Sequence, residues 1–314
     1  MQPEKRRPGT GLIVAVAMLG AVLTGCGDDA SDDRPAVIAT TTVLGDVVTR
    51  VAGDGATVEV LLPLGADPHG YQASARQAAA VVEADLVVAN GLGLEVGLHD
   101  VLESAAADGA TILEASTLID PIPFGEGAHD EPDDEDEHGE YDPHLWLDPL
   151  RMAEVARGIA AALEESHPGG GWTERAEAYA AELAEADRQI AEILAAVPEQ
   201  NRKLITAHEA LGYFADRYGF EVVGTVIPGG STLADPSSAE LAGLVEVIEA
   251  EGVRAIFGET TDPTSLIDAV AGELGEQIVV VELYTGSLGA AGSGAETLID
   301  MLLSNARAIA AALG

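Results

Sequence analysis

The sequence is poor in three features that would each point to a common class of protein. It contains one cysteine, Cys26, so no disulfide can form within the chain. Lysine and arginine number only 15 against 54 aspartate and glutamate residues, which argues against a nucleic-acid partner because phosphates attract basic side chains. The apolar run from Leu12 to Leu23 is too short to cross a bilayer as a helix. The net charge of −39 suits a cation ligand, a saline habitat or high solubility equally well, so charge alone identifies no function.

The N-terminus has the pattern of an export signal. Basic residues at positions 5–7 precede the apolar run, which ends in Leu23-Thr24-Gly25-Cys26. This last stretch resembles the bacterial lipobox, which implies cleavage before Cys26 and acylation of its thiol. We therefore expect a signal peptide over 1–25, a tether over 26–36, and a mature protein that is extracytoplasmic and lipid-anchored to the cell membrane.

Short apolar runs alternate with helical patterns through the remainder of the chain. Ala-rich segments between the runs repeat apolar residues with the 3.6-residue period of a helix. Seven runs read as buried strands bounded by turn residues: AVIATTT (36–42), TVEVLLP (57–63), DLVVANG (85–91), KLITAHE (203–209), EVVGTVIP (221–228), RAIFGET (254–260) and QIVVVELY (277–284). The alternation predicts an α/β fold with mostly parallel sheets.

A long helix is predicted in the middle of the chain. From Thr173 to Val197 the helical pattern contains no glycine or proline. We expect an N-terminal lobe over 37–170, a connecting helix over 171–200 and a C-terminal lobe over 201–314.

An acidic tract over 125–141 has no periodicity and few apolar residues, so it predicts a mobile loop. A solvated charge run is the favoured interpretation of this tract. Loose gathering of cations, with transient help from His129 and His138, is the alternative.

Three of the seven histidines occur at comparable junctions. His69 follows a predicted strand and a proline, His144 follows Pro143, and His208 follows the strand KLIT. Ligands of open α/β sheets bind beyond the carboxyl ends of the strands, so the three imidazoles are expected at one crevice. A preceding proline stiffens the backbone and lowers the entropy lost when an ion binds.

The residues alone leave alternatives open. Each histidine taken singly can be a separate loop or capping residue, although three at similar junctions favour a shared metal site. Asp67, Asp142 or Asp148 can accept the second imidazole N–H and fix the tautomer. His99 and His167 are predicted at the surface.

Several dispersed motifs resemble the zinc- and manganese-binding solute-binding lipoproteins of bacterial ABC transporters. They are VIATTTVLGDVV, LLPLGADPHGYQ, DPHLWLDP, LITAHEALGYFADRYGF, AIFGETTDP and LYTGSLG, in that order, and they cover nearly everything after the lipobox. The resemblance implies two Rossmann-like lobes joined by a long rigid helix, with the metal in the cleft between them. It also implies that His69, His144 and His208 are ligands.

One departure from the family pattern affects the ligand set. The last loop usually carries an aspartate ligand, where this sequence has Gly286. Water, Glu259 or Glu282 can complete the coordination, with Glu259 the better carboxylate, and either glutamate can instead lie behind a ligand or at the surface. Loss of an oxygen ligand favours Zn²⁺ over Mn²⁺, because three imidazoles suit tetrahedral zinc.

The favoured function is capture of Zn²⁺, or alternatively Mn²⁺, for delivery to a membrane permease, by a protein that is not an enzyme and is expected to be a monomer. Two alternatives are carried. One is a zinc hydrolase in which three histidines and a water form the centre and Glu259 is the base. The other is a surface adhesin, a role reported for some members of the family.

Overall fold

The computed structural model describes residues 34–124, 140–261, 265–275 and 278–314. Residues Arg34–Gly314 form one compact unit. The predicted signal peptide, Cys26, and residues 125–139 of the acidic tract lie outside the described residues. In the part of the chain that is described, no helix has the length and apolar content needed to cross a membrane.

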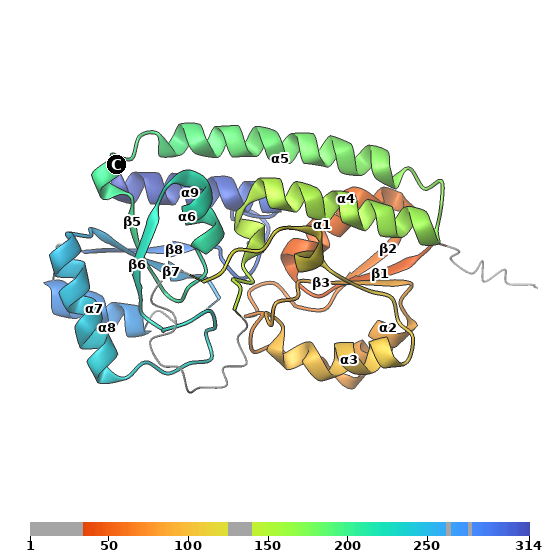
Figure 1. The fold of residues 1–314 in the computed structure, drawn as a ribbon, viewed down its shortest axis with the longest axis horizontal. Coiled ribbons are helices and arrows are strands. Elements are labelled where there is room, and N and C mark those ends of the chain that lie inside the picture. The colour runs from red at the N-terminus through yellow and green to blue at the C-terminus, as the bar shows by residue number, and fades with distance from the viewer. Residues whose placement is uncertain (1–33, 125–139, 262–264, 276–277) are drawn as a thin grey trace, which may run out of the picture. The chain divides into compact units, whose positions relative to one another are not determined.

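Two four-stranded sheets form the framework of this unit, and every strand pair in them is parallel (Figure 1). The first sheet has the order β2-β1-β3-β4 and the second has the order β6-β5-β7-β8. Their strands are β1 (Ala36–Ala39), β2 (Thr57–Val60), β3 (Leu86–Ala89), β4 (Ile112–Glu114), β5 (Lys203–Thr206), β6 (Glu221–Thr225), β7 (Ala255–Glu259) and β8 (Val279–Leu283). The predicted α/β class with two parallel-sheet lobes is confirmed.

Seven of these strands coincide with the predicted apolar runs, and β4 was not predicted. This strand has three residues at the edge of its sheet, two of them half-buried and one exposed. A strand of three residues gives too short an apolar run to be distinguished from the sequence pattern of the preceding helix.

Helices follow the strands and begin at recognisable capping residues. Thr41 accepts the N–H of Leu44 at the start of the first helix, and Ser74 and Gln77 form a capping box at the second. The helices are α1 (Thr42–Ala52), α2 (Ala75–Glu83), α3 (His99–Ala107), α4 (Pro149–Ser166), α5 (Trp172–Leu194), α6 (Gly212–Tyr218), α7 (Ser238–Glu251), α8 (Ser265–Leu274) and α9 (Leu298–Leu313).

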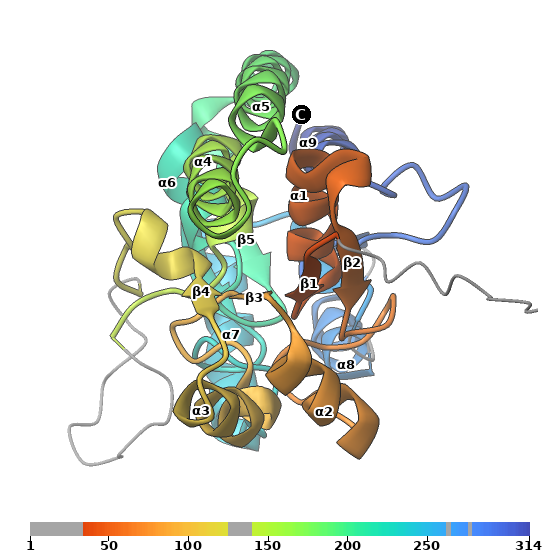
Figure 2. The ribbon, with the colours of Figure 1, turned by 90° about the vertical axis from the view of Figure 1, so that its right-hand side faces the viewer.

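The long helix α5 has 23 residues and is therefore about 35 Å long. Its buried residues recur every three or four positions from Trp172 through Tyr179 and Leu183 to Leu194. This face packs against α1, α4 and α9, and Figures 1 and 2 show α5 running beside α4. The helix ends before Pro198, which cannot continue it.

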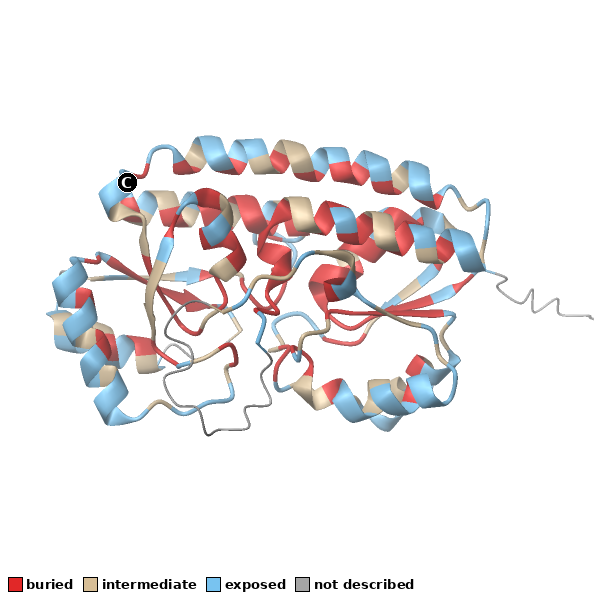
Figure 3. Cartoon of the chain, in the orientation of Figure 1, coloured by how far each residue is buried: buried red, intermediate tan, exposed pale blue. Residues whose placement is uncertain are grey.

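The largest apolar cluster contains residues from both halves of the chain. Val37 of β1, Phe257 of β7 and Ile309 of α9 all belong to it. Figure 3 shows buried residues concentrated where α1, α4 and α9 meet the two sheets. Because the halves share a core, their separation would expose apolar surface, which limits how far one half can move against the other.

Candidate metal site

His69 lies in the loop that follows β2. The backbone N–H of His69 donates to Asp67 Oδ1 at 3.0 Å, which closes a tight turn around Pro68. The other oxygen of Asp67 accepts a hydrogen bond of 2.5 Å from the hydroxyl of Thr232, in the loop between β6 and α7. The loop of His69 is therefore tied to the other half of the chain.

His144 lies between Pro143 and the 3₁₀ turn Leu145–Leu147, which leads into α4. Asp142 Oδ1 lies 2.8 Å from the backbone N of His144 and 2.8 Å from its ring Nδ1. Trp146 packs edge-on against the imidazole and donates its indole N–H to the carbonyl of Thr285 at 2.7 Å. Of the three aspartates left open by the sequence, Asp142 is the one behind His144.

His208 follows β5, and the carboxylate behind it comes from the neighbouring strand. Glu259 is the last residue of β7, which pairs with β5, and its Oε1 lies 2.5 Å from Nδ1 of His208. The carboxyl ends of parallel strands meet at one edge of the sheet, so this pairing is a direct result of the topology.

The structure brings together the three histidines that the sequence singled out. Nε2 of His144 lies 3.3 Å from Nε2 of His69 and 3.0 Å from Nε2 of His208. One ring nitrogen from each histidine lies within 4.8 Å of the others, and no ring residue is more than 2% exposed. The cluster is therefore built from both halves and is shielded from solvent.

The contacts behind the rings determine what the cluster can bind. When His144 and His208 are neutral and donate Nδ1–H to Asp142 and Glu259, both present an unprotonated Nε2 to the cluster. Two such acceptors at 3.0 Å repel each other unless a cation lies between them. A proton or a metal ion supplies that cation.

Burial and charge shift the pKa values of these groups in different directions. Burial, with the charge of His208, holds the pKa of His144 well below its usual value. Burial also acts to lower the pKa of His208, but the charge and hydrogen bond of Glu259, with Asp67 and Asp142, raise it overall. Burial raises the pKa of Asp142 to about 7, against the hydrogen bond from the backbone N–H of His144.

Two effects of opposite sign act on the pKa of Glu259. Burial acts to raise its pKa, but the charge of His208 and the hydrogen bond to it lower that pKa overall. The group is therefore a negative charge placed behind the His208 ring.

Glu259, Glu282 and Gly286 are the positions that bear on the fourth ligand of a metal ion. The carboxylate of Glu259 faces Nδ1 of His208, whereas the other ring nitrogen, Nε2, faces His144. Glu282 is exposed. Gly286 is buried, and a Cβ built on it would lie 3.1 Å from Pro68 Cδ and 3.1 Å from Thr261 Oγ1.

The other described histidines lie apart from this cluster. The side chain of His99 is 76% exposed, and His167 is half-buried after the end of α4. His129 and His138 lie outside the described residues. Sequence reasoning missed Thr232, because a threonine in a Gly- and Pro-rich loop carries no signal for a contact with Asp67.

The two halves, each with a parallel sheet, share one buried cluster of three imidazoles, two from the first half and one from the second, and this arrangement suits the capture of a metal ion. The chain belongs to the ZnuA family, zinc-uptake complex component A, periplasmic, whose family model matches residues 37–312. It is a metal-binding, substrate-binding protein of an ABC importer and not an enzyme, so the hydrolase alternative is wrong.

Relatives of known name agree with this assignment. The chain is 31% identical to the manganese-binding lipoprotein MntA of Halalkalibacterium halodurans, over 94% of each chain. It is 29% identical to the zinc-binding protein TroA of Treponema pallidum, over 96% of each. The solved structure of that periplasmic zinc-binding protein superposes with a TM-score of 0.79 at 29% identity, covering 90% of this chain and 99% of that one.

Proposed function

We propose that His69, His144 and His208 bind the transported ion and that this ion is Zn²⁺. The convergence of the three Nε2 atoms carries the proposal. A tetrahedral zinc ion with Zn–N distances of about 2.0–2.1 Å requires its nitrogens to be about 3.4 Å apart. The separations of 3.3 and 3.0 Å are close to that value.

A water molecule completes the coordination in this proposal. Gly286 offers no side-chain ligand, Glu259 faces the opposite nitrogen of His208, and Glu282 is exposed. Three neutral nitrogens and one oxygen suit zinc, whereas manganese prefers more oxygen ligands. The named relatives bind manganese in one case and zinc in another, so the ligand set of this chain, rather than its kinship, supports zinc.

Delivery of the ion requires a membrane permease and a location next to it. We propose that the protein is a monomer anchored through a lipid on Cys26 to the outer face of the cell membrane, where a permease takes the ion. The lipobox-like stretch before Cys26 supports the anchor. Replacement by serine, Cys26→Ser, should move the protein from the membrane fraction to the soluble one, and unchanged partitioning would refute the anchor.

Competitive titration tests the choice of metal. Metal-free protein is titrated with Zn²⁺ and with Mn²⁺ against a chelator of known affinity, alongside His144→Ala. We expect zinc to bind at least about 100-fold more tightly, or about 2.7 kcal/mol. Equal affinities, or tighter manganese, would overturn the zinc assignment, whereas unchanged binding in His144→Ala would overturn the site itself.

A further inference from the structure

A strained turn follows β3 and runs from Asn90 to Leu98, and we refer to it as the 90–98 turn. Leu92 has φ of 55° and is the one non-glycine residue with positive φ among the residues that the structure describes. Gly91 and Gly93 on either side of it have φ of 83° and 72°. The two glycines adopt positive φ readily, but Leu92 does so at a cost in free energy, so surrounding contacts must hold it there.

The contacts that hold this turn come from a buried carboxylate. Glu95 is 6% exposed, and its Oε1 accepts the N–H of Asn90 at 2.7 Å and the hydroxyl of Thr40 at 2.7 Å. Its Oε2 accepts the N–H of Gly91 at 3.2 Å. A buried carboxylate that accepts several hydrogen bonds fixes the backbone that donates them, because leaving any of these groups unpaired is costly.

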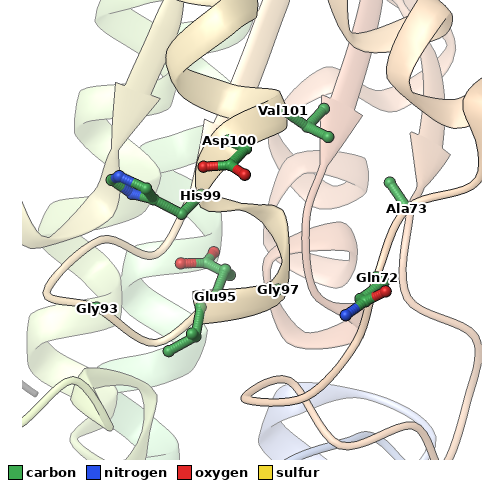
Figure 4. Close-up of a pocket in the computed structure, with 9 residues that line it drawn as sticks. Gln72, Ala73, Gly93, Glu95, Gly97, His99, Asp100 and Val101 are labelled. Atoms are coloured by element: carbon green, nitrogen blue, oxygen red, sulfur yellow. The ribbon is translucent and has the colours of Figure 1, made fainter. Parts of the chain in front are cut away.

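The turn lies beside a pocket of about 640 Å³. Figure 4 shows Gly93, Glu95 and Gly97 along one segment, with Gln72 on the segment across from it. Gln72 belongs to the loop that carries His69. The 90–98 turn and that loop therefore face each other.

Each end of the 90–98 turn contacts a different loop of the metal site. Asn90 is fully buried, and its Nδ2 donates to the carbonyl of Pro143, the residue before His144, at 2.8 Å. At the other end, a Cβ on Gly97 would lie 2.2 Å from the carbonyl oxygen of Tyr71, two residues after His69. Only glycine permits that approach without displacing one of the two segments.

We propose that the 90–98 turn is a positioning element that sets the placement of His69 against His144. The proposal rests on the metal site proposed above. Groups that orient metal ligands contribute about 10- to 100-fold to metal affinity, and small displacements of a ligand weaken a site. Neither Asn90 nor Gly97 belongs to the histidine cluster, so each acts through the loop that it contacts.

The experiment for the Asn90 end compares Asn90→Ala with Asn201→Ala. Asn201 also donates its Nδ2 to a backbone carbonyl, that of Leu313, at 2.8 Å, but it lies between α5 and β5, away from the cluster. We expect Asn90→Ala to weaken zinc by about 10-fold or more and to alter the visible spectrum of bound Co²⁺, which reports ligand geometry. Asn201→Ala should leave both unchanged.

The Gly97 end is tested separately by Gly97→Ala, with Gly243→Ala as its control. No heavy atom lies within 4 Å of a Cβ built on Gly243, in α7. We expect Gly97→Ala to reproduce the loss of affinity and the changed Co²⁺ spectrum through the other loop. This variant keeps the proposal testable even where Asn90→Ala does not fold.

The outcomes separate the two proposals. The positioning role would be refuted if folded Asn90→Ala and Gly97→Ala kept the zinc affinity and the Co²⁺ spectrum of the wild type. If His144→Ala bound zinc more weakly in the same experiment, the metal site would still be supported. Wild-type affinity in His144→Ala as well would refute the metal site. Equal losses in the two control variants would also refute the positioning role, because the effect would then be general destabilisation.

Discussion

The three buried imidazoles differ in what lies behind each ring. Glu259 carries a charge that favours the protonated form of His208, while burial keeps His144 neutral. The cluster therefore holds one ring that binds a proton readily and one that resists it. A metal ion at this site competes chiefly with the proton on His208.

Loss of any one imidazole should weaken the site. We expect His69→Ala, His144→Ala and His208→Ala each to reduce zinc affinity by at least about tenfold, or about 1.4 kcal/mol. His99→Ala, at a side chain that is 76% exposed, serves as the matched control and should bind as wild type. Titration of each variant against a chelator gives the answer, and a wild-type affinity in any of the three would remove that residue from the ligand set.

Zinc affinity should fall as the pH is lowered through the pKa of His208. That pKa is raised above its usual value of 6.5, so the ring is neutral and able to bind metal only above the raised value. Zinc affinity is therefore highest above the raised pKa of His208 and decreases as the pH falls below that pKa. Measurement between pH 5 and 9 should show the fall, and Glu259→Gln should move it to lower pH. An unmoved midpoint in that variant would show that Glu259 does not control the titration.

Among the structural elements, apolar runs predicted strands that are buried throughout, such as β3 and β7, and also strands that are partly exposed, such as β2 and β8. The edge strand β4 was missed because its three residues form too short an apolar run. The histidines were predicted because each follows a strand or a proline and carries a ring that binds metal ions. Asn90 also follows a strand, but its amide gives no signal for a contact with Pro143, and Thr232 follows neither a strand nor a proline.

The acidic tract should be removable without loss of the site. Its described ends are adjacent, because the backbone N–H of Phe124 donates to the carbonyl of Glu140 at 3.4 Å and the backbone N–H of Asp142 donates to the carbonyl of Ile122 at 2.9 Å. We expect replacement of residues 126–139 by a short Gly-Ser turn to change zinc affinity by less than about threefold, or about 0.6 kcal/mol. Calorimetric titration measures this, and a loss as large as that of His144→Ala would assign the tract to the tight site.

At the scale of the whole molecule, the two halves are joined across the site as well as along α5. Asp67 of the first half accepts a hydrogen bond from Thr232 of the second, and Trp146 donates to Thr285. These links depend on which loops the two sheets bring together. No local sequence pattern specifies a contact between two distant loops, so these hydrogen bonds could not be predicted from the sequence.

Removal of the Asp67–Thr232 link should speed the release of zinc. Thr232→Val keeps the shape of the side chain but removes the donor. A hydrogen bond to a charged group contributes about 1.5 kcal/mol, so we expect release to be about tenfold faster. Thr117→Val, which removes an exposed hydroxyl bonded to the carbonyl of Glu114, is the control. Stopped-flow release into excess chelator measures both, and equal rates would show that the link does not restrain the ion.

X-ray absorption spectroscopy of the zinc-loaded protein measures the ligands of the ion itself. We expect a four-coordinate ion with three imidazole nitrogens at about 2.0–2.1 Å and one further oxygen, and the same spectrum when residues 126–139 are replaced. A shell with two imidazoles or fewer, or six-coordinate zinc dominated by oxygen, would refute the site formed by His69, His144 and His208.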